Sequence, residues 1–458
     1  MKIREIFAPS DMTEGTPWKK ILIFAIPLLL GNIAQQLYNT VDSIVVGKYV
    51  GDNALAAVGS ASPIFNFLLV LFVGISVGAG IMVAQYFGAK AKDELAKTIG
   101  NCITLTALAT IVLMCTMIFA IRPILELLNT PDSIIGWCHS YLTILLLGIG
   151  GLAYYNILCG ILRGLGDSIS ALVYLLIATV INIILDVYFV AKLNMGVSGV
   201  ALATAIAQTI SAVLCLIKLL RMQDSFHLKK SDFILSADIS FTLIRLGLPS
   251  GVTQAIFSIA MILVQSLTNS FGEMVIAANV IIMRVDGFAM MPNMSFGNAM
   301  TTYAGQNVGA NRYDRVYEGA KQGCLLALAV STSVTLIILL FGHKLMYAFT
   351  DTAELVEMSM RYMRILAVGY IAIAVYQSLA GVMRGAGDTM TQMYISIFCN
   401  VLFRVPLAYA LVHFTKSEAL PNGAPEGVFV SLLICWLLLT VLVVIAYRKG
   451  KWKDKAIS

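Results

Sequence analysis

Two acidic residues, Asp42 and Asp186, lie inside segments that are otherwise apolar enough to cross a membrane. Because an ionisable group at membrane depth is costly, both carboxylates are candidates for function. The amide of Asn182 lies four residues before Asp186 and so shares its helix face. Thr204, in the next apolar segment, adds a hydroxyl. We interpret these four residues as one polar site.

Counting along the predicted helices places three of these side chains at one depth. Asp42 precedes the outer end of the first helix by about five residues, and Asp186 precedes that of the fifth by about four. Thr204 lies about six residues into the sixth helix, which enters from the same side. At about 1.5 Å per residue, all three lie roughly 6–9 Å below the outer membrane boundary.

This group of side chains is suited to binding a small cation. Two carboxylates in a poorly hydrated site cannot both stay ionised unless a positive charge joins them. A proton or Na⁺ can supply that charge, and oxygen ligands suit Na⁺. We expect no other cofactor, and a metal site at Asp42, Asn182, Asp186 and Thr204 only if the coupling ion is Na⁺. The alternative is that both acids merely cap helices or snorkel to the interface.

The second half of the chain carries different chemistry. At a shift of 218 residues, Asp186 falls on Arg404, so an acid is replaced by a base. Asp286 is the acid at depth in this half, and we expect it to pair with Arg404. Methionine adapts to varied shapes, although a methionine stripe is more often ordinary packing. We expect the substrate cavity to be lined by Gln35, Asn39, Met283, Asp286, Met290, Met294 and Arg404.

Composition indicates the elements that position these residues. Of the 458 residues, 59% are hydrophobic and 12% are charged, and the mean hydropathy is +0.86, well outside the range of soluble domains. Long apolar runs predict an all-α polytopic membrane protein with twelve transmembrane helices. We place these at about residues 19–47, 53–87, 95–121, 133–162, 168–191, 197–220, 238–271, 274–307, 316–343, 352–382, 389–412 and 427–448.

The distribution of charge predicts orientation. Most of the 31 Lys and Arg residues fall in the terminal segments and in the loops on the same side as both termini. By the positive-inside rule, both termini are cytoplasmic in a multi-pass protein of the cell membrane. The net charge of +6 is therefore explained by the loops, and we expect no nucleic-acid partner.

An internal repeat divides the chain. Tyr141–Asp167 resembles Tyr362–Asp388 at a shift of 221 residues, and Gln85–Asp93 resembles Gln306–Asp314 at the same shift. Six helices per repeat predict two lobes related by a pseudo-two-fold axis along the membrane normal, with a cavity near the midplane. We expect an N-terminal lobe at 1–222, a cytoplasmic linker at 223–240 and a C-terminal lobe at 241–458.

The repeat includes an Arg-Gly-x-Gly-Asp turn at residues 163–167 and again at 384–388. We interpret each turn as a helix boundary, in which glycine supplies left-handed backbone and aspartate caps the next helix. A gating role is the alternative.

Several of these motifs resemble those of the multidrug and toxic compound extrusion (MATE) transporters, in order and over nearly the whole chain. They are Gln36-Leu-Tyr-Asn-Thr-Val-Asp42, Gln85-Tyr-Phe-Gly88, Arg163-Gly-Leu-Gly-Asp167, Asn182-Ile-Ile-Leu-Asp186 and Gly199-Val-Ala-Leu-Ala-Thr204. The resemblance implies drug antiport driven by H⁺ or Na⁺, with a cation site in the N-terminal lobe at Asp42, Asn182, Asp186 and Thr204. The family branch with an acid in the seventh helix is not matched.

We therefore expect a secondary active antiporter that exports amphipathic or cationic compounds by alternating access. The alternative is a flippase for lipid-linked oligosaccharides or peptidoglycan precursors, which usually needs several basic residues in its cavity. We do not expect an enzyme, because no nucleophile–base arrangement is evident. The expected partners are a small-molecule substrate and membrane lipid, and the protein is expected to be a monomer.

Overall fold

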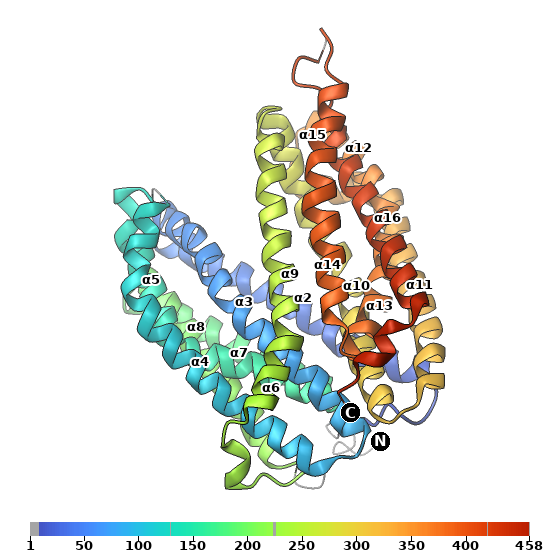
Figure 1. Cartoon of the computed structure of the whole chain (residues 1–458). Helices are drawn as coiled ribbons and strands as arrows, with labels where there is room; N and C mark the ends of the chain where they lie inside the picture. The colour runs from blue at the N-terminus through green and yellow to red at the C-terminus, as the bar shows by residue number, and fades with distance from the viewer. Residues whose placement is uncertain (1–8, 129, 223–225, 419, 458) are drawn as a thin grey trace. The chain divides into compact units, whose positions relative to one another are not determined.

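The computed structural model describes residues 9–457 apart from 129, 223–225 and 419, and we refer only to these residues. The described chain is helical, and its single β-bridge joins Ser417 to Leu420. The course of the helices is drawn in Figure 1.

In the first half, the described residues form seven α-helices and two short helical turns. They are α2 (Pro17–Tyr49), α3 (Asp52–Gly88), α4 (Lys92–Leu127), α5 (Asp132–Leu147), α6 (Ile149–Gly164), α7 (Ser168–Asp186), the π-helical η1 (Val187–Lys192), α8 (Gly196–Leu220) and the 3₁₀ turn η2 (Lys230–Phe233).

The second half follows the same order except that an α-helix, α15, continues the chain after the π-helical segment. It contains α9 (Ala237–Asn269), α10 (Glu273–Gly309), α11 (Tyr313–Tyr347), α12 (Ala353–Ala367), α13 (Gly369–Gly385), α14 (Thr389–Ile397), the π-helical η3 (Phe398–Phe403), α15 (Arg404–Phe414), α16 (Glu426–Lys449) and the 3₁₀ turn η4 (Lys451–Lys455).

Among the described residues, ten helices are long and apolar enough to cross a membrane, and two bent helix pairs raise the number to twelve. These twelve elements coincide with the twelve predicted spans, so the predicted fold class is confirmed. Two predicted spans, 133–162 and 352–382, are each broken into two helices, at angles of 52° and 42°.

Close helix packing accompanies both breaks. Gly148 separates α5 from α6, and a Cβ added there would collide with Ala205 of α8. Gly369 begins α13, and a Cβ added there would collide with the Trp436 ring of α16. These two glycines are equivalent in the internal repeat. Hydropathy detects the length of a span but not such a bend, so the breaks were not predicted.

The Arg-Gly-x-Gly-Asp turns are helix boundaries, as predicted. Gly166 and Gly387 have φ of +83° and +96°, in the left-handed region that glycine adopts without strain. The Asp167 carboxylate accepts a hydrogen bond from the Ser170 amide at 2.9 Å and caps α7. Asp388 caps α14 through the Thr391 amide at 3.3 Å.

The chain folds into two compact units. Unit 1 holds Pro27–Gly251 together with a short piece that ends at Asp11, and unit 2 holds Met12–Ile26 together with Val252 onward. The boundaries therefore fall inside α2 and α9 rather than at the predicted residues 222 and 241. Each unit includes the first turns of a helix whose remainder belongs to the other. That the functional lobes follow 1–222 and 241–458 stays a prediction.

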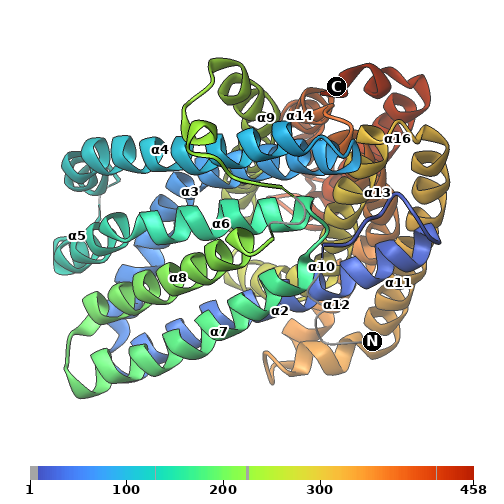
Figure 2. The same ribbon diagram turned by 90° about the horizontal axis from the view of Figure 1, so that it is seen from below.

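Unit 1 is held together by close helix approaches. Within it, α6 packs against α3, α4 and α8, and α7 packs against α8, as Figure 2 shows from below. Small residues permit these contacts, because bulkier side chains would keep the backbones apart. For example, a Cβ added to Gly80 of α3 would lie 3.1 Å from the carbonyl oxygen of Gly160 in α6.

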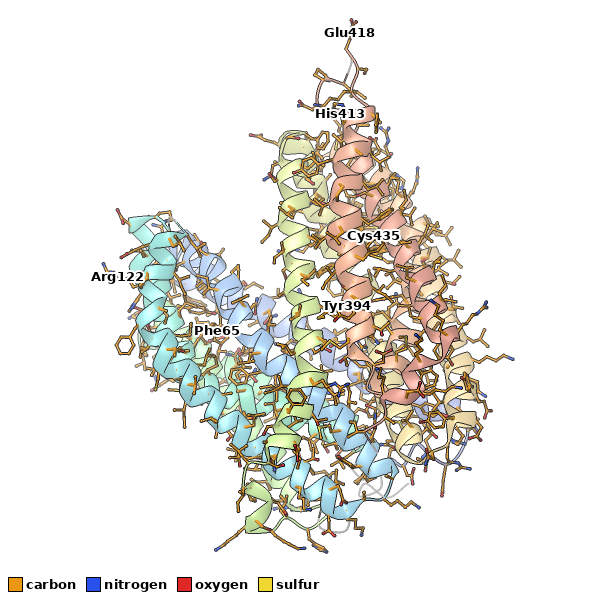
Figure 3. All side chains as sticks on the ribbon, in the orientation of Figure 1. Phe65, Arg122, Tyr394, His413, Glu418 and Cys435 are labelled. Carbon is orange, nitrogen blue, oxygen red and sulfur yellow. The ribbon has the colours of Figure 1, made fainter. Side chains whose placement is uncertain are left out.

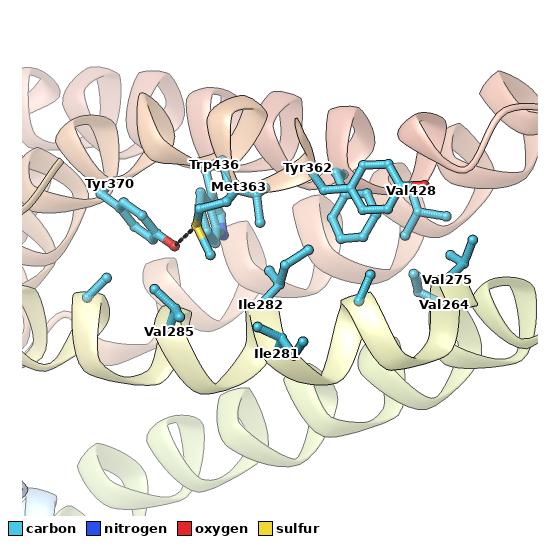
Figure 4. Packing of buried hydrophobic residues seen from close by; sticks show 14 of the residues in the cluster. Val264, Val275, Ile281, Ile282, Val285, Tyr362, Met363, Tyr370, Val428 and Trp436 are labelled. Atoms are coloured by element: carbon cyan, nitrogen blue, oxygen red, sulfur yellow. Dashed lines mark hydrogen bonds between the residues drawn. The ribbon is translucent and has the colours of Figure 1, made fainter. Parts of the chain in front are cut away.

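Unit 2 has an apolar core between α10, α12, α13 and α16. The rings of Tyr362 and Phe429 stack with centroids 4.4 Å apart, and Tyr370 lies 5.6 Å from Trp436. These aromatic side chains face Val285 and other aliphatic residues of α10 (Figure 4). The loop after α15, which carries the Glu418 side chain, extends past the helix ends (Figure 3).

Candidate cation and substrate sites

Three helices of unit 1 carry the four residues of the predicted cation site. Asp42 lies on α2, Asn182 and Asp186 lie on α7, and Thr204 lies on α8. Asn182 and Asp186 have no exposed surface. The α-helical part of α7 ends at Asp186, and the chain continues as the π-helix η1. A local change from α to π geometry is frequent at functional sites.

The side-chain amide of Asn182 joins both carboxylates. Its hydrogen bonds are satisfied when the nitrogen faces the acids, an orientation assigned from these bonds. The nitrogen then donates to Asp42 Oδ1 at 2.8 Å and to Asp186 Oδ2 at 3.2 Å, and the amide oxygen accepts from the Tyr38 hydroxyl at 3.2 Å. The structure therefore brings Asp42, Asn182 and Asp186 together, with the acids on one side of the bundle.

Unpaired oxygen atoms lie in the same group. Thr204 faces Asp42 and Tyr38. Among the described residues, Thr204 Oγ1 and Asp186 Oδ1 are buried without a hydrogen-bond partner. A buried polar atom normally has a partner, so Asp186 Oδ1 is free to accept a proton and both oxygens are free to ligate a hard cation.

Two tyrosines of this site were missed by the sequence analysis. Tyr38 is buried and precedes Asp42 by four residues, so helical spacing could have found it. Tyr141, on α5, is also buried and lies close enough to interact electrostatically with both acids. No spacing relates Tyr141 to the acids, because its helix is set against them only by tertiary packing.

Unit 2 contains a cavity of about 420 Å³ between α9, α10 and α12–α16. Five of the seven predicted substrate-cavity residues line it: Met283, Asp286, Met290, Met294 and Arg404. The other two, Gln35 and Asn39, lie on the unit 1 part of α2, so the structure does not place them in this cavity. Gln35 is half-buried and Asn39 is exposed.

The predicted ion pair between Asp286 and Arg404 is wrong as a direct contact. Within the described chain, no nitrogen of Arg404 lies within 4.0 Å of an Asp286 oxygen. Arg404 Nη1 instead donates to Met261 Sδ at 3.7 Å. Asp286 lies beside the Tyr370 hydroxyl, and the two charges interact only at longer range. Both residues thus line one cavity without forming an ion pair.

Comparison with known proteins gives one family. The MatE family model matches residues 27–188 and again residues 249–410, at the spacing of the internal repeat. The chain is 29% identical to the probable multidrug resistance protein YoeA of Bacillus subtilis, over 99% of this chain and 98% of the relative. It is 24% identical to the probable multidrug resistance protein NorM of Thermotoga maritima, over 96% and 94% of the two chains.

A solved structure has the same fold. It is the outward-facing conformation of a multidrug resistance MATE family transporter of the MOP superfamily, with a TM-score of 0.88 and 25% identity. The match covers 96% of this chain and 97% of the other. The twelve-helix architecture described above is thus shared over nearly the full length.

Proposed function

Because the chain belongs to the MatE family of membrane transporters, we propose that it exports amphipathic or cationic small molecules in exchange for H⁺ or Na⁺. The names of two similar proteins, both probable multidrug resistance proteins, support drug export. The similar transporters are not enzymes, and this chain is proposed to act as a monomeric carrier in the cell membrane with both termini in the cytoplasm.

One observation carries the proposed coupling. A single amide nitrogen, that of Asn182, lies within hydrogen-bonding distance of both Asp42 and Asp186. Two carboxylates this close repel one another in a low dielectric unless a cation joins them. Binding of H⁺ or Na⁺ removes the repulsion and draws the helices together, and release of the ion restores it. Ion loading and conformation are thereby linked.

We propose that alternating access uses the two helices that belong to both units, α2 and α9. Proline in a helix frees a backbone carbonyl and permits bending. Pro27 lies where α2 passes from unit 2 into unit 1, and Pro249 lies two residues before α9 leaves unit 1. The similar transporter in an outward-facing conformation supports such a cycle.

The proposal is tested by gradient-driven efflux of ethidium from inverted membrane vesicles. Under an imposed pH or Na⁺ gradient, we expect Asp186→Asn to transport ethidium at least about tenfold more slowly than wild type, because one carboxylate can no longer exchange the ion. The matched control is Asp132→Asn, which alters an exposed carboxylate at the start of α5. Equal efflux by wild type and Asp186→Asn would refute the coupling.

No observation favours the flippase alternative. Within the described cavity of unit 2, Arg404 is the only basic lining residue, whereas a pyrophosphate headgroup calls for several. Purified protein that moved lipid-linked precursors across vesicles but left ethidium in place would support the flippase instead.

A further inference from the structure

The cavity of unit 2 has the size and composition of a small-molecule site. Its volume of about 420 Å³ lies within the range of drug-sized pockets. Phe257, Trp436 and the flexible Met283 and Met294 supply apolar walls. Such walls suit an amphipathic molecule with an aromatic or aliphatic body.

Two opposite charges project into this apolar cavity. Arg404 is only 3% exposed, and its Nε is buried without a hydrogen-bond partner. Asp286 Oδ1 is likewise buried and unpartnered. No ion pair joins the two residues within 4.0 Å among the described residues. A buried charge without a direct partner is costly, so each of these groups gains from a ligand of opposite sign.

The side chains around Arg404 and Asp286 do not neutralise either charge. Arg404 Nη1 donates to the thioether of Met261, a weak acceptor that cannot neutralise the guanidinium. Asp286 lies beside the neutral phenol of Tyr370, which donates to Met363 Sδ at 3.4 Å. The rest of the polar lining consists of neutral amides and hydroxyls, among which Asn279 Nδ2 donates to Gln265 Oε1 at 3.0 Å.

From this arrangement we propose that the unit 2 cavity binds zwitterionic amphipathic compounds, whose ammonium group pairs with Asp286 and whose carboxylate pairs with Arg404. A ligand with one charge satisfies one of these residues and leaves the other unpaired, whereas a zwitterion satisfies both. This inference rests on the proposed exporter function and narrows its substrate class. It concerns unit 2 alone and does not involve the cation site of unit 1.

Three probes with one fluorescent body test the inference. Nε-dansyl-lysine is zwitterionic, its methyl ester keeps only the ammonium, and its Nα-acetyl derivative keeps only the carboxylate. Binding to the purified full-length protein in lipid nanodiscs is measured by dansyl fluorescence, in buffer near pH 7, which is below the α-amino pKa of about 7.7–8.0. We expect wild type to bind the zwitterion at least about tenfold more tightly than either singly charged probe.

Substitutions separate the two contacts. The Asp286→Asn variant is expected to bind the zwitterion and the acetyl derivative with equal affinity, because it has lost the contact with the ammonium. The Arg404→Gln variant is expected to bind the zwitterion and the methyl ester with equal affinity, because it has lost the contact with the carboxylate. The exposed residues Glu357 and Arg364 of α12 provide charge-matched controls, Glu357→Gln and Arg364→Gln, which are expected to keep the wild-type preference. Wild type that binds the ester as tightly as the zwitterion would overturn the inference, and this comparison needs no variant to fold.

Ethidium efflux distinguishes this inference from the exporter proposal. Ethidium transport without a preference for the zwitterion would overturn the inference alone. A zwitterion preference in a protein that does not move ethidium would support the inference and count against drug export. Loss of the preference in both control variants would also overturn it, because the effect would not depend on the cavity.

Discussion

At the scale of single residues, Asn182 holds the central position in the proposed cation site. Its amide nitrogen contacts both acids, and its oxygen accepts from Tyr38. Ionised carboxylates only accept hydrogen bonds, so they meet the amide nitrogen, and the Tyr38 hydroxyl holds this orientation by donating to the amide oxygen. Tyr38 is therefore a positioning residue that acts on the ion through Asn182.

Removal of the Tyr38 hydroxyl tests this role. We expect Tyr38→Phe to slow gradient-driven ethidium efflux by roughly two- to tenfold, the effect of losing one net hydrogen bond. The control is Tyr49→Phe, because Tyr49 ends the same helix and is half exposed. Efflux should be compared in vesicles with equal amounts of each protein. Equal efflux rates for Tyr38→Phe, Tyr49→Phe and wild type would show that the Tyr38 hydroxyl does not orient the Asn182 amide.

The sequence predicted part of the site for a specific physical reason. A helix rises by a fixed amount per residue, so counting predicted a common level for Asp42, Asp186 and Thr204, and the structure places these side chains in one group. Rotation of each helix about its axis and the angle of neighbouring helices depend on packing. Tyr141 was missed for that reason, and the direct pairing of Asp286 with Arg404 was wrong because Arg404 contacts Met261 and Asp286 contacts Tyr370 instead.

At the scale of elements, the break between α5 and α6 connects packing to the cation site. Gly148 lies against Ala205, which directly follows Thr204 on α8. Hydropathy predicted a continuous span here, since neither glycine nor a bend changes the length of an apolar run. The bend depends on how closely two helices approach, which a single sequence does not specify.

A methyl group at this contact should affect both stability and transport. Gly148→Ala places a Cβ against Ala205, so α8 must shift, and overpacking of this kind costs about 1–3 kcal/mol. We expect Gly148→Ala to have a lower melting temperature, measured by fluorescence-detected size-exclusion chromatography. We also expect slower ethidium efflux, because Thr204 moves with α8. Gly136→Ala is the control, since a Cβ at this glycine of α5 meets nothing within 4 Å. Equal melting temperatures for both variants would contradict this account.

At the scale of the whole molecule, the two units do not follow the two halves of the sequence. Unit 2 takes Met12–Ile26 from the first half, and unit 1 takes the chain as far as Gly251 from the second. The N-terminal segment is fixed within unit 2 by specific contacts, because the Met12 amide donates to Gln306 Oε1 at 2.8 Å. Arg315 Nη2 donates to the Gly15 carbonyl at 2.8 Å. Neither sequence half therefore contains a complete unit.

Expression of the chain as two fragments tests whether each unit needs the helical turns that it takes from the other half of the sequence. A split after Met222 leaves every transmembrane helix intact, but each fragment lacks the helical turns that its unit takes from the other. We expect fragments 1–222 and 223–458 to support ethidium efflux when they are co-expressed, and each fragment alone to be degraded, because exposed unpaired helix faces destabilise a membrane protein. A split after Gly251 is the comparison, since it cuts α9 within its span and leaves backbone groups unsatisfied in the bilayer. Stable accumulation of either 1–222 or 223–458 alone would show that the exchanged turns are dispensable, so that each half folds by itself as the internal repeat suggests.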